Sequence, residues 1–446
     1  MSERIFGTDG VRGVANADLS PELAFRVGRA AAVVLAHEVD AERPIVVGRD
    51  TRVSGPMLEA ALVAGICSAG RDVLLVGVLP TPAVALITQA IEAAAGAMIS
   101  ASHNPIADNG IKLFGGDGFK LSDALEEEIE SDIAADAGPR PTGLEVGGVK
   151  AAQGLQSRYL VHLMEHAHAL QGLEIVVDGA YGAAFGIAPE ALRRLGASVH
   201  PINCEPDGAR INVACGATHL DSLVAEVRRH PGSVGVAFDG DADRALFVDE
   251  EGRVVNGDHI LALLAAEMQR AGELPEGTIV ATVMSNVGLE RALHELGLRL
   301  ERAAVGDRYV LERMQSGGHP LGGEQSGHII DLRRNTTGDG PMTAVSVFSL
   351  MARRGARLAD LASHIKTYPQ VLINVPTRRR ELVDHAEVRA RIAAVTQALG
   401  EEGRVLVRPS GTEPLLRVMV EGPDRPTVVR MAEEIAAAIR AAGGER

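Results

Sequence analysis

Cysteine is scarce in this 446-residue chain, which holds only Cys67, Cys204 and Cys215. Their number is odd and no two form a Cys-x-x-Cys pair, so neither a disulfide framework nor a cysteine-ligated zinc site is supported. Long hydrophobic runs are also missing, because no apolar stretch reaches the ~18 residues of a membrane-spanning helix and no secretory signal opens the chain. These absences predict a soluble, cytoplasmic protein that has no membrane partner.

The chain also has fewer basic than acidic residues. The chain has 44 Lys and Arg residues against 59 Asp and Glu residues, which gives a formal net charge of −15. Such an acidic protein has no electrostatic reason to bind nucleic acid, so we expect no nucleic-acid partner. The Gly-x-x-x-x-Gly-Lys-Ser/Thr motif of a nucleotide P-loop is absent as well. Any phosphate that the chain handles therefore need not come from ATP.

Alternation of apolar strands and helices is plentiful, and 46% of the residues are hydrophobic. Three times, a short apolar strand is followed by a helix that ends at a glycine and by a second strand: residues 44–76, 174–200 and 278–300. This order predicts three related α/β domains with largely parallel sheets. From about residue 369, short strands and two helices predict a smaller α+β domain. The expected domains are 1–152, 153–253, 254–368 and 369–446.

A hydroxyl and an imidazole lie side by side in the segment Ser100-Ala-Ser-His-Asn-Pro105, directly after an apolar run. The proline ends any strand, so Ser102 and His103 are expected on a loop that a core element positions, which is the usual place for reacting groups. Ser, Asn and Pro are also common turn residues. The segment alone therefore fits a polar turn as well as a nucleophile, and it leaves Ser100 and Ser102 both as candidates.

Three carboxylates, Asp239, Asp241 and Asp243, alternate between two strand-like runs. On a loop, side chains at this spacing can converge on one hard cation. An EF-hand calcium loop would place Glu250 at its twelfth position, but its sixth position requires glycine and is Arg244 here, and its flanks would be helices. We therefore favour one Mg²⁺ ion at a strand end over a calcium loop or a solvated acidic turn. Arg244 would then contact a phosphate or a carboxylate.

Two further loops carry polar side chains between glycines. In the first, Glu324, Gln325 and Ser326 offer donors and acceptors that suit sugar hydroxyls and amines, although a flexible glycine turn fits equally well. The second has Arg408 before and Arg417 after a Ser-Gly-Thr segment, which is typical of an anion cradle. A hairpin loop with surface arginines is the alternative.

Together the four loops fit phosphoryl transfer through a phosphoserine. A serine close to Mg²⁺, a separate phosphate clamp and a polyol-type loop supply its parts, with the protein mainly positioning the reactants. His103 or Lys112 would move the proton.

Five motifs, in order, resemble those of the α-D-phosphohexomutase superfamily, and the resemblance covers essentially the full length. They are Phe6-Gly-Thr-Asp-Gly-Val-Arg-Gly13, Ser100-Ala-Ser-His-Asn-Pro105, Asp239-Gly-Asp-Ala-Asp-Arg244, Gly323-Glu-Gln-Ser-Gly-His328 and Arg408-Pro-Ser-Gly-Thr-Glu-Pro414. The resemblance implies four domains around a central cleft, each giving one loop. The catalytic candidates that follow from it are Ser102, His103, Lys112 and Arg12.

The resemblance also implies a role for each loop. Ser102, rather than Ser100, would carry the phosphate. The metal ligands would be Ser102, Asp239, Asp241 and Asp243. The substrate contacts would be Arg244, Glu324, Ser326, Arg408, Ser410, Gly411, Thr412 and Arg417, of which the last five would hold the phosphate that does not react.

The implied reaction interconverts glucosamine 6-phosphate and glucosamine 1-phosphate through a glucosamine 1,6-bisphosphate intermediate, which also acts as activator. The product would feed UDP-N-acetylglucosamine and cell-wall precursor synthesis in bacteria. Gln325, where the phosphomannomutase/phosphoglucomutase branch tends to have Met, favours the glucosamine branch. That other branch, a Mg-dependent sugar-phosphate phosphatase and a non-catalytic sugar-phosphate binder remain as alternatives. The family often forms homodimers, so a homodimer is a further expectation.

Overall fold

The computed structural model describes residues 4–7, 9–35, 42–136, 138–410 and 414–443. Contacts within the chain divide it into two compact units. The first runs as far as Met284 and takes in Leu300–Ser363 as well. The second consists of Ser285–Arg299 and the chain from His364 onward.

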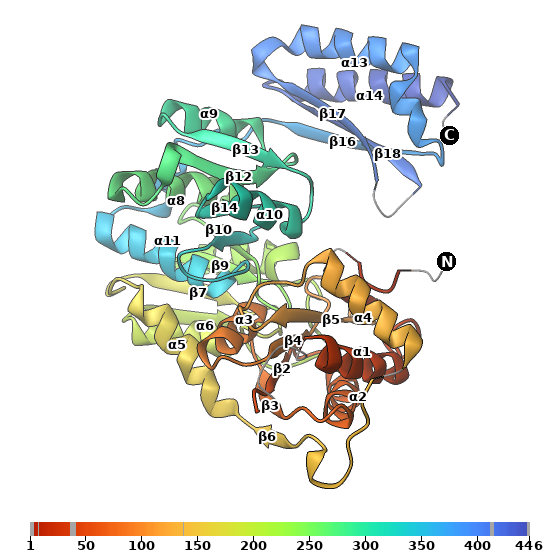
Figure 1. Ribbon diagram of the computed structural model, residues 1–446. Helices are drawn as coiled ribbons and strands as arrows, with labels where there is room; N and C mark the ends of the chain where they lie inside the picture. Colours follow the sequence, from red (N-terminus) through yellow and green to blue (C-terminus); the bar gives the residue numbers. More distant parts are fainter. Residues whose placement is uncertain (1–3, 8, 36–41, 137, 411–413, 444–446) are drawn as a thin grey trace. The chain divides into compact units, whose positions relative to one another are not determined.

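The first sheet of the larger unit has the strand order β1-β5-β4-β2-β3-β6 (Figure 1). Strand β2 runs parallel to β3 and β4, whereas β5 runs antiparallel to β4 and to β1. The strands are β1 (Val11–Val14), β2 (Ile45–Arg49), β3 (Val73–Val78), β4 (Ala95–Ile99), β5 (Asp108–Gly115) and β6 (Val149–Ala151). The accompanying helices are α1 (Pro21–Val34), α2 (Gly55–Ser68), α3 (Thr81–Ala90) and α4 (Asp123–Ala135).

Helices α1 and α2 pack backbone against backbone because glycine stands at their crossing. A Cβ atom on Gly28 would lie 2.2 Å from the carbonyl oxygen of Leu62, and one on Gly65 would lie 2.0 Å from that of Phe25. Apolar residues at helical spacing after Ser20-Pro21 predict a helix over residues 21–39. Helix α1 begins at this position, with Ser20 accepting a hydrogen bond from the Leu23 amide at 3.3 Å and with proline in the first turn. It ends at Val34, and residues 36–39 of the predicted helix lie outside the described residues.

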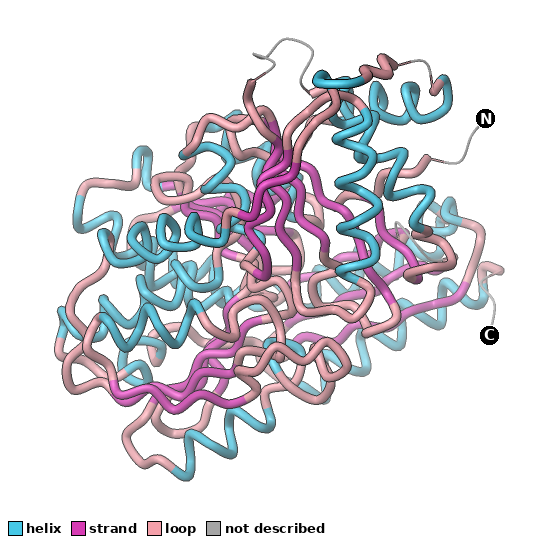
Figure 2. Tube along the Cα trace, turned by 90° about the horizontal axis from the view of Figure 1, so that it is seen from below, coloured by secondary structure: helices cyan, strands magenta, loops and turns pink. Residues whose placement is uncertain are grey.

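The second sheet has the order β11-β10-β9-β7-β8, with β7 parallel to β8 and β9 and an antiparallel edge from β9 to β11. Figure 2 shows strands (magenta) with helices (cyan) alongside. The strands are β7 (Glu174–Asp178), β8 (Ser198–Ile202), β9 (Val234–Phe238), β10 (Ala245–Val248) and β11 (Val254–Val255). The helices are α5 (Gln156–Glu165), α6 (Ile187–Arg194) and α7 (Asp221–Arg229).

The third sheet has the order β13-β12-β14-β15, with β12 parallel to β14 and β14 antiparallel to β15. Its strands are β12 (Thr278–Thr282), β13 (Arg299–Ala303), β14 (Leu321–Gly323) and β15 (Ile329–Asp331). The helices of this part of the larger unit are α8 (Gly257–Ala271), α10 (Asp307–Gly317), α11 (Gly340–Arg354) and α12 (Leu358–Ala362).

The smaller unit is built on an antiparallel sheet of order β16-β18-β17. Its strands are β16 (Gln370–Pro376), β17 (Arg404–Pro409) and β18 (Leu415–Glu421), and its helices are α9 (Val287–Glu295), α13 (Ala386–Leu399) and α14 (Arg425–Ala441). Apolar side chains of α13 and α14 form one core with those of the sheet. Single 3₁₀ turns in the chain are Gly143–Glu145, Gln153–Leu155, Gly216–Thr218, Pro275–Gly277, Arg380–Asp384 and Gly400–Glu402.

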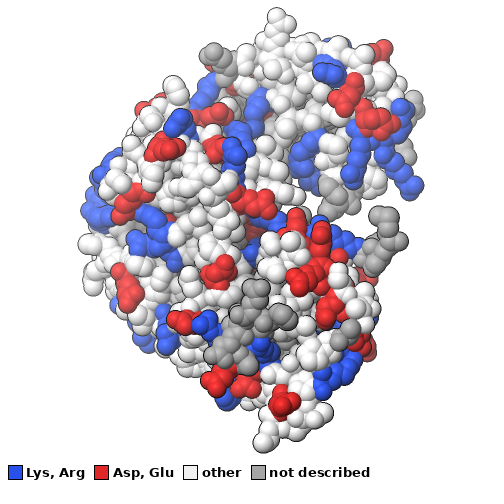
Figure 3. All heavy atoms as spheres, viewed as in Figure 1, with Lys and Arg blue, Asp and Glu red and all other residues white. Residues whose placement is uncertain are grey.

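The predicted fold class is confirmed: three mixed α/β sheets with parallel central strands precede a small antiparallel α+β domain. No helix among the described residues is long and apolar enough to cross a membrane. Acidic and basic side chains are intermingled over the face shown in Figure 3. Exposed charged side chains also form ion pairs, for example Arg353 and Arg354 with Glu267 at 2.9 and 2.7 Å, and each such pair adds at most about 1 kcal/mol of stability.

Candidate active site

Ser102 lies in the turn that connects the buried strand β4 to β5. Its backbone has a φ of 51°, in the left-handed region, which costs a residue with a side chain about 1 kcal/mol or more. The residue is 1% exposed, and its Oγ lies 2.5 Å from Oδ2 of Asp239 and 3.3 Å from Nδ1 of His103. The unusual backbone therefore directs the hydroxyl at the acidic loop.

The buried side chain of Arg52 stabilises the turn that carries Ser102. Its side chain is 0% exposed, and its guanidinium donates hydrogen bonds to four backbone carbonyls of the turn. These are the carbonyls of Ser102, Asn104, Pro105 and Asp108, at 2.8, 2.9, 2.6 and 3.0 Å. The planar fork of arginine has five N–H donors spread over three nitrogens, whereas a lysine has three donors on a single nitrogen, so lysine could not reach all of these acceptors. From the second domain, Asn212 donates to the Ser102 carbonyl as well, at 2.8 Å.

Ser100 belongs to the same supporting network. Its hydroxyl donates to Asp50 at 2.6 Å and accepts the Ser102 amide at 2.9 Å, while Asp50 also receives the Nε of Arg52 at 3.0 Å. Complete burial raises the pKa of Asp50 to about 6 against the opposing effects of Arg52 and Ser100. Because the Ser100 hydroxyl is committed to Asp50, the geometry favours Ser102 as the hydroxyl that reacts.

The acidic loop joins β9 to β10, two antiparallel strands that carry Asp239, Asp241 and Asp243 on the turn between them. All three residues are buried, and one oxygen of each lies within 4.8 Å of the others. Oδ1 of Asp241 and Oδ1 of Asp243 are buried without a hydrogen-bond partner. Converging carboxylate oxygens that lack donors are the ligands that a hard divalent cation requires, so the residues present fit Mg²⁺.

The electrostatics of this triad are those of crowded like charges. Burial, together with the charges of Asp243 and Asp241, raises the pKa of Asp239 well above its ordinary range. Burial acts on Asp243 too, but Lys112 and His328 overcome it and hold the pKa of that carboxyl well below its ordinary range.

Lys112 reaches the triad from β5. Its Nζ lies 2.7 Å from Asp241, 3.3 Å from Asp243 and 3.1 Å from Asp9. Burial alone would lower the pKa of Lys112, but these carboxylates raise it well above its usual value, so the side chain is a charged ammonium. Burial and the charge of Arg244 lower the pKa of His103 to about 4. Of the two predicted proton carriers, the neutral His103 is therefore the one that has a free lone pair near pH 7, whereas the Lys112 ammonium has none.

A second set of charges surrounds the first. Arg12 pairs with Asp9, and Lys120 bridges Asp9 and Asp307. His328 lies 3.6 Å from an oxygen of Asp243 and 3.6 Å from one of Asp307. The backbone amide of Arg244 donates to Asp239 at 3.2 Å, and its side chain lies 3.9 Å from Asp243. Arg12, Lys112 and Arg244 thus line the same acidic site as Ser102.

The predicted sugar loop connects β14 to β15. Oε2 of Glu324 accepts the Ser326 hydroxyl at 3.3 Å, and Oε1 accepts the Gly306 amide at 3.3 Å. Gln325 turns instead to Asp258 of α8, at 3.1 Å. The loop adjoins the acidic loop, because the Ala245 amide donates to the carbonyl of Gly327 at 3.0 Å. A Cβ on Gly327 would lie 2.4 Å from the Ala245 carbonyl oxygen, which explains the need for glycine there.

In the smaller unit, Arg408 of β17 and Arg417 of β18 are register partners on neighbouring antiparallel strands. Burial and the charge of Arg417 lower the pKa of Arg408. Ser410 is buried and its amide donates to the Leu415 carbonyl at 2.9 Å. Two like charges held side by side next to a hydroxyl favour an anion. The other predicted phosphate contacts, Gly411 and Thr412, lie outside the described residues.

Several residues of the site are not among the candidates that the sequence predicts, although Asp9 and His328 lie within two of the quoted motifs. They are Asp9, Asp50, Arg52, Thr81, Lys120, Asn212, Asp307 and His328. Thr81, for example, donates to Asp241 at 2.6 Å from the start of α3. A usable signal existed for Asp50 and Arg52, because they follow β2 directly in a charged loop after a buried strand. Thr81 and Lys120 stand in segments without such a pattern.

Four family models match the chain, all of phosphoglucomutase/phosphomannomutase. The alpha/beta/alpha domains I, II and III match residues 3–139, 157–252 and 256–368, and the C-terminal domain matches residues 372–438. Among solved structures, a phosphoglucomutase/phosphomannomutase family protein from Burkholderia thailandensis has a TM-score of 0.85 at 24% identity, covering 100% of this chain and 99% of that one. The N-acetylphosphoglucosamine mutase of Aspergillus fumigatus, solved with GlcNAc-6P and magnesium, has a TM-score of 0.67 at 19% identity, covering 98% and 96%.

Curated relatives are closer. The phosphoglucosamine mutase of Moorella thermoacetica is 54% identical over 426 residues, which cover 95% of this chain and 96% of the relative. That of Symbiobacterium thermophilum is 52% identical and covers 98% and 99%. That of Mycolicibacterium paratuberculosis is 51% identical and covers 98% and 99%. With all four domain models matched in order and full-length relatives at this identity, the chain belongs to the phosphoglucosamine mutases of the phosphohexomutase superfamily.

Proposed function

We propose that the chain is an isomerase, an intramolecular phosphotransferase that interconverts glucosamine 6-phosphate and glucosamine 1-phosphate. The observation that carries this proposal is the buried contact of the Ser102 hydroxyl with Asp239. Lys112 and Arg244 contact aspartates of the same site. The full-length relatives named phosphoglucosamine mutase select the sugar. The phosphomannomutase/phosphoglucomutase alternative is not favoured, because none of those names refers to it.

Ser102 is the carrier of the phosphoryl group. In the first step its Oγ–P bond breaks while a new O–P bond forms at O1 of glucosamine 6-phosphate. The proton released by the O1 hydroxyl passes to His103, whose imidazole is neutral, and returns to the departing Ser102 oxygen. The reverse transfer, from O6 of the reoriented glucosamine 1,6-bisphosphate to Ser102, leaves glucosamine 1-phosphate and a phosphorylated enzyme.

Asp239, Asp241 and Asp243 would hold one Mg²⁺ together with the phosphate on Ser102. When bound, the ion neutralises the charge of the transferring phosphoryl group and of the crowded carboxylates. Lys112 is held charged against Asp241 and keeps positive charge beside the phosphoryl oxygens. Arg12 fixes the position of Asp9, which in turn holds Lys112.

The end-for-end turn of the bisphosphate explains why the phosphate clamp and the sugar loop are separate. One phosphate-binding site, the phosphate clamp, must accept the phosphate on either O1 or O6. Arginine side chains can do this because their hydrogen bonds go to the phosphate oxygens and not to the sugar. We assign this clamp to Arg408, Ser410, Gly411, Thr412 and Arg417. Glu324 and Ser326 would accept the sugar hydroxyls in both orientations, because carboxylate and hydroxyl groups bind diols without demanding one arrangement.

The bisphosphate serves in this proposal as both intermediate and activator. A solved relative, the N-acetylphosphoglucosamine mutase of A. fumigatus, has been determined with glucose 1,6-bisphosphate. We infer a cytoplasmic enzyme that acts on a free phosphosugar, and a homodimer stays a prediction.

The test is to incubate the purified chain with glucosamine 6-phosphate, Mg²⁺ and a trace of glucosamine 1,6-bisphosphate, and to follow the two monophosphates by ³¹P NMR. We expect glucosamine 1-phosphate to form, with slower conversion of glucose 6-phosphate and mannose 6-phosphate in parallel samples. Release of inorganic phosphate without the isomer would show a phosphatase instead. Faster conversion of mannose 6-phosphate than of glucosamine 6-phosphate would show a phosphomannomutase/phosphoglucomutase instead.

A further inference from the structure

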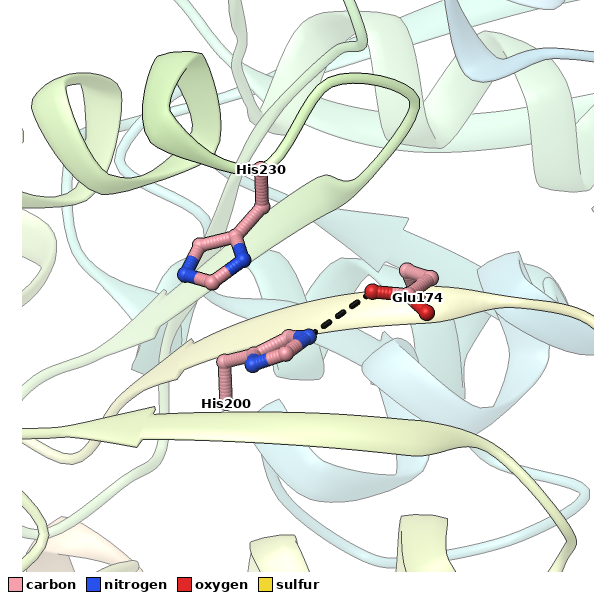
Figure 4. A group of neighbouring side chains, drawn as sticks. All are labelled: Glu174, His200 and His230. Carbon is pink, nitrogen blue, oxygen red and sulfur yellow. Dashed lines mark hydrogen bonds and ion pairs between the residues drawn. The ribbon is translucent and has the colours of Figure 1, made fainter.

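A second group of metal-binding side chains lies in the second domain, away from the aspartate loop (Figure 4). Glu174 opens β7, and His200 lies on the parallel neighbour β8. The register pairs Val176 with His200, so Glu174 and His200 are diagonal neighbours on one face of the sheet. His230 is the first residue after α7 and reaches over the same face. Three separate elements therefore deliver these side chains to one place.

Their contacts form a chain of imidazoles and carboxylates. Nε2 of His200 lies 2.8 Å from Oε2 of Glu174, and the two imidazole rings are stacked with centroids 4.0 Å apart. Nε2 of His230 lies 3.2 Å from Oε1 of Glu226, whose other oxygen is held by Arg229 at 2.8 Å. At His230 the carboxylate of Glu226 on Nε2 leaves the other ring nitrogen for an ion, which is the arrangement that orients metal-binding histidines. At His200 the carboxylate on Nε2 is Glu174, which is itself a candidate ligand.

The donor atoms need little movement to meet. One ligand atom from each of Glu174, His200 and His230 lies within 4.8 Å of the others. Bonds of about 2.0–2.1 Å to a four-coordinate ion would place them about 3.3 Å apart. The side chains of His200 and His230 are about a third exposed (30% and 33%), so the stacked rings have room to turn toward this shorter spacing. The same exposure leaves room for water as a further ligand.

The donor set also determines which metal fits. Two imidazole nitrogens and one carboxylate oxygen suit Zn²⁺, Co²⁺, Ni²⁺ or Cu²⁺, whereas Mg²⁺ prefers oxygen ligands only. The three aspartates of the reaction site therefore favour Mg²⁺, whereas Glu174, His200 and His230 favour a transition-metal ion. We propose that Glu174, His200 and His230 form a site for a transition-metal ion of the Zn²⁺ class, which ties β7, β8 and the end of α7 together.

The experiment uses the full-length protein, stripped with a chelator and then kept in excess Mg²⁺ to occupy the aspartate loop. Co²⁺ is added, and its visible absorption reports coordination by nitrogen and oxygen. We expect one equivalent to bind, with Zn²⁺ displacing it. His200→Gln and His230→Gln should each weaken Co²⁺ binding by about tenfold or more, and Glu226→Gln by up to about tenfold. His219→Gln, which changes an exposed histidine of the same domain, is the matched control and should bind like the wild type.

A second readout separates loss of the site from loss of the fold. Zn²⁺ should raise the melting temperature of the wild type and of His219→Gln, but not that of His200→Gln, because an ion stabilises only the state that binds it. Glucosamine-phosphate turnover should be equal in all of these variants, which confirms their folding. Co²⁺ binding of unchanged affinity in His200→Gln and His230→Gln would overturn the proposal, as would the absence of any Co²⁺ binding beyond the Mg²⁺-protected loop.

Discussion

Ser102 is a serine in a backbone conformation that glycine would adopt freely. With a φ of 51°, its hydroxyl lies against Asp239. Strain of this kind is stored where surrounding contacts fix it, and here the fixing contacts come from Arg52 and Asn212. The functional requirement and the stability of the turn are therefore in conflict at this residue.

This conflict makes a paired prediction. Both Ser102→Ala and Ser102→Gly should abolish turnover, because each lacks the hydroxyl that carries the phosphate. Ser102→Gly should nevertheless be more stable than Ser102→Ala by about 1 kcal/mol, since glycine takes a positive φ without a Cβ clash. Denaturant unfolding and ³¹P NMR measure the two effects. An alanine variant as stable as the glycine variant, or turnover in either, would contradict the assignment.

Asp241 provides a test of the metal site. We expect Asp241→Asn to raise the Mg²⁺ concentration needed for half-maximal activity by about tenfold or more, because the number of charged ligands sets affinity. The KM for glucosamine 6-phosphate should change much less. Asp249→Asn is the matched control: Asp249 is also buried, but it accepts the backbone amides of Glu251 and Arg253 after β10. Equal changes in Mg²⁺ requirement and KM for Asp241→Asn would count against a role in metal binding.

Asp50 should make stability depend on pH. Its pKa is about 6 in the folded chain and near 3.8 when exposed, so between these values the folded state holds a proton that the unfolded state releases. Its contribution to stability is therefore present at low pH and is lost as pH rises toward 6. Relative to Asp50→Asn, the wild type should lose about 1 kcal/mol between pH 5 and pH 7, as measured by urea unfolding without Mg²⁺. A constant difference would refute the raised pKa.

At the scale of elements, the turn between β4 and β5 depends on one arginine. Arg52→Lys keeps the charge but loses the fork, so several buried carbonyls of the turn lose their donor. We expect a loss of about 2–4 kcal/mol in unfolding free energy and a fall in kcat that exceeds any change in KM. Arg313→Lys, at an exposed pair with Glu301, should leave both values close to those of the wild type. An Arg52→Lys variant with the stability and activity of the wild type would show that the turn keeps its conformation without the guanidinium.

The strands that bear the site were predictable to different degrees. The sequence indicates strands where β7, β9 and β10 lie, because their apolar runs are short and bordered by polar turns. Strand β5 was missed, since Asp108-Asn-Gly reads as a turn, although it delivers Lys112. Its pairing with β4 is a long-range choice that overrides this local preference.

The side-chain contacts of the site follow the same division. Ser102, the three aspartates and Glu324 each lie in a short contiguous motif, which makes them recognisable in the sequence. The position of Arg52 after β2 indicates a site residue, but its role in holding the turn is not predictable, because backbone carbonyl partners leave no pattern in the sequence. The pair Lys120–Asp307 joins residues 187 positions apart, and only the folded chain brings them together.

At the scale of the whole molecule, sequence order and physical unit do not coincide. The segment Ser285–Arg299, which follows β12 of the third sheet, belongs to the smaller unit. Asn286 makes this connection: it caps α9 through the Gly288 amide at 3.0 Å, and its amide group donates to the Tyr368 carbonyl at 2.9 Å and to Glu421 at 3.2 Å. A Cβ on Gly288 would lie 1.8 Å from the Lys366 carbonyl oxygen.

Asn286→Ala should therefore loosen the smaller unit selectively. We expect faster hydrogen exchange in α9 and in β16 and β18, because the buried partners of Asn286 lose their hydrogen bonds. Exchange in β9 and β10 of the larger unit should stay unchanged and serves as the internal control. Faster exchange spread evenly over the chain would instead show that the two units unfold together.

The anchoring of the Ser102 turn has a consequence for how the first phosphate arrives. A protein kinase needs its target serine on an extended, exposed peptide that can lie in the kinase's own groove. Here the backbone carbonyls of Ser102 and Asn104 are held by one buried guanidinium, and the serine is 1% exposed. Freeing this segment would require unfolding the end of β4 and the start of β5. If Ser102 carries the phosphate as proposed, we therefore expect its donor to be a small phosphosugar that enters the site rather than a protein kinase that docks on the surface.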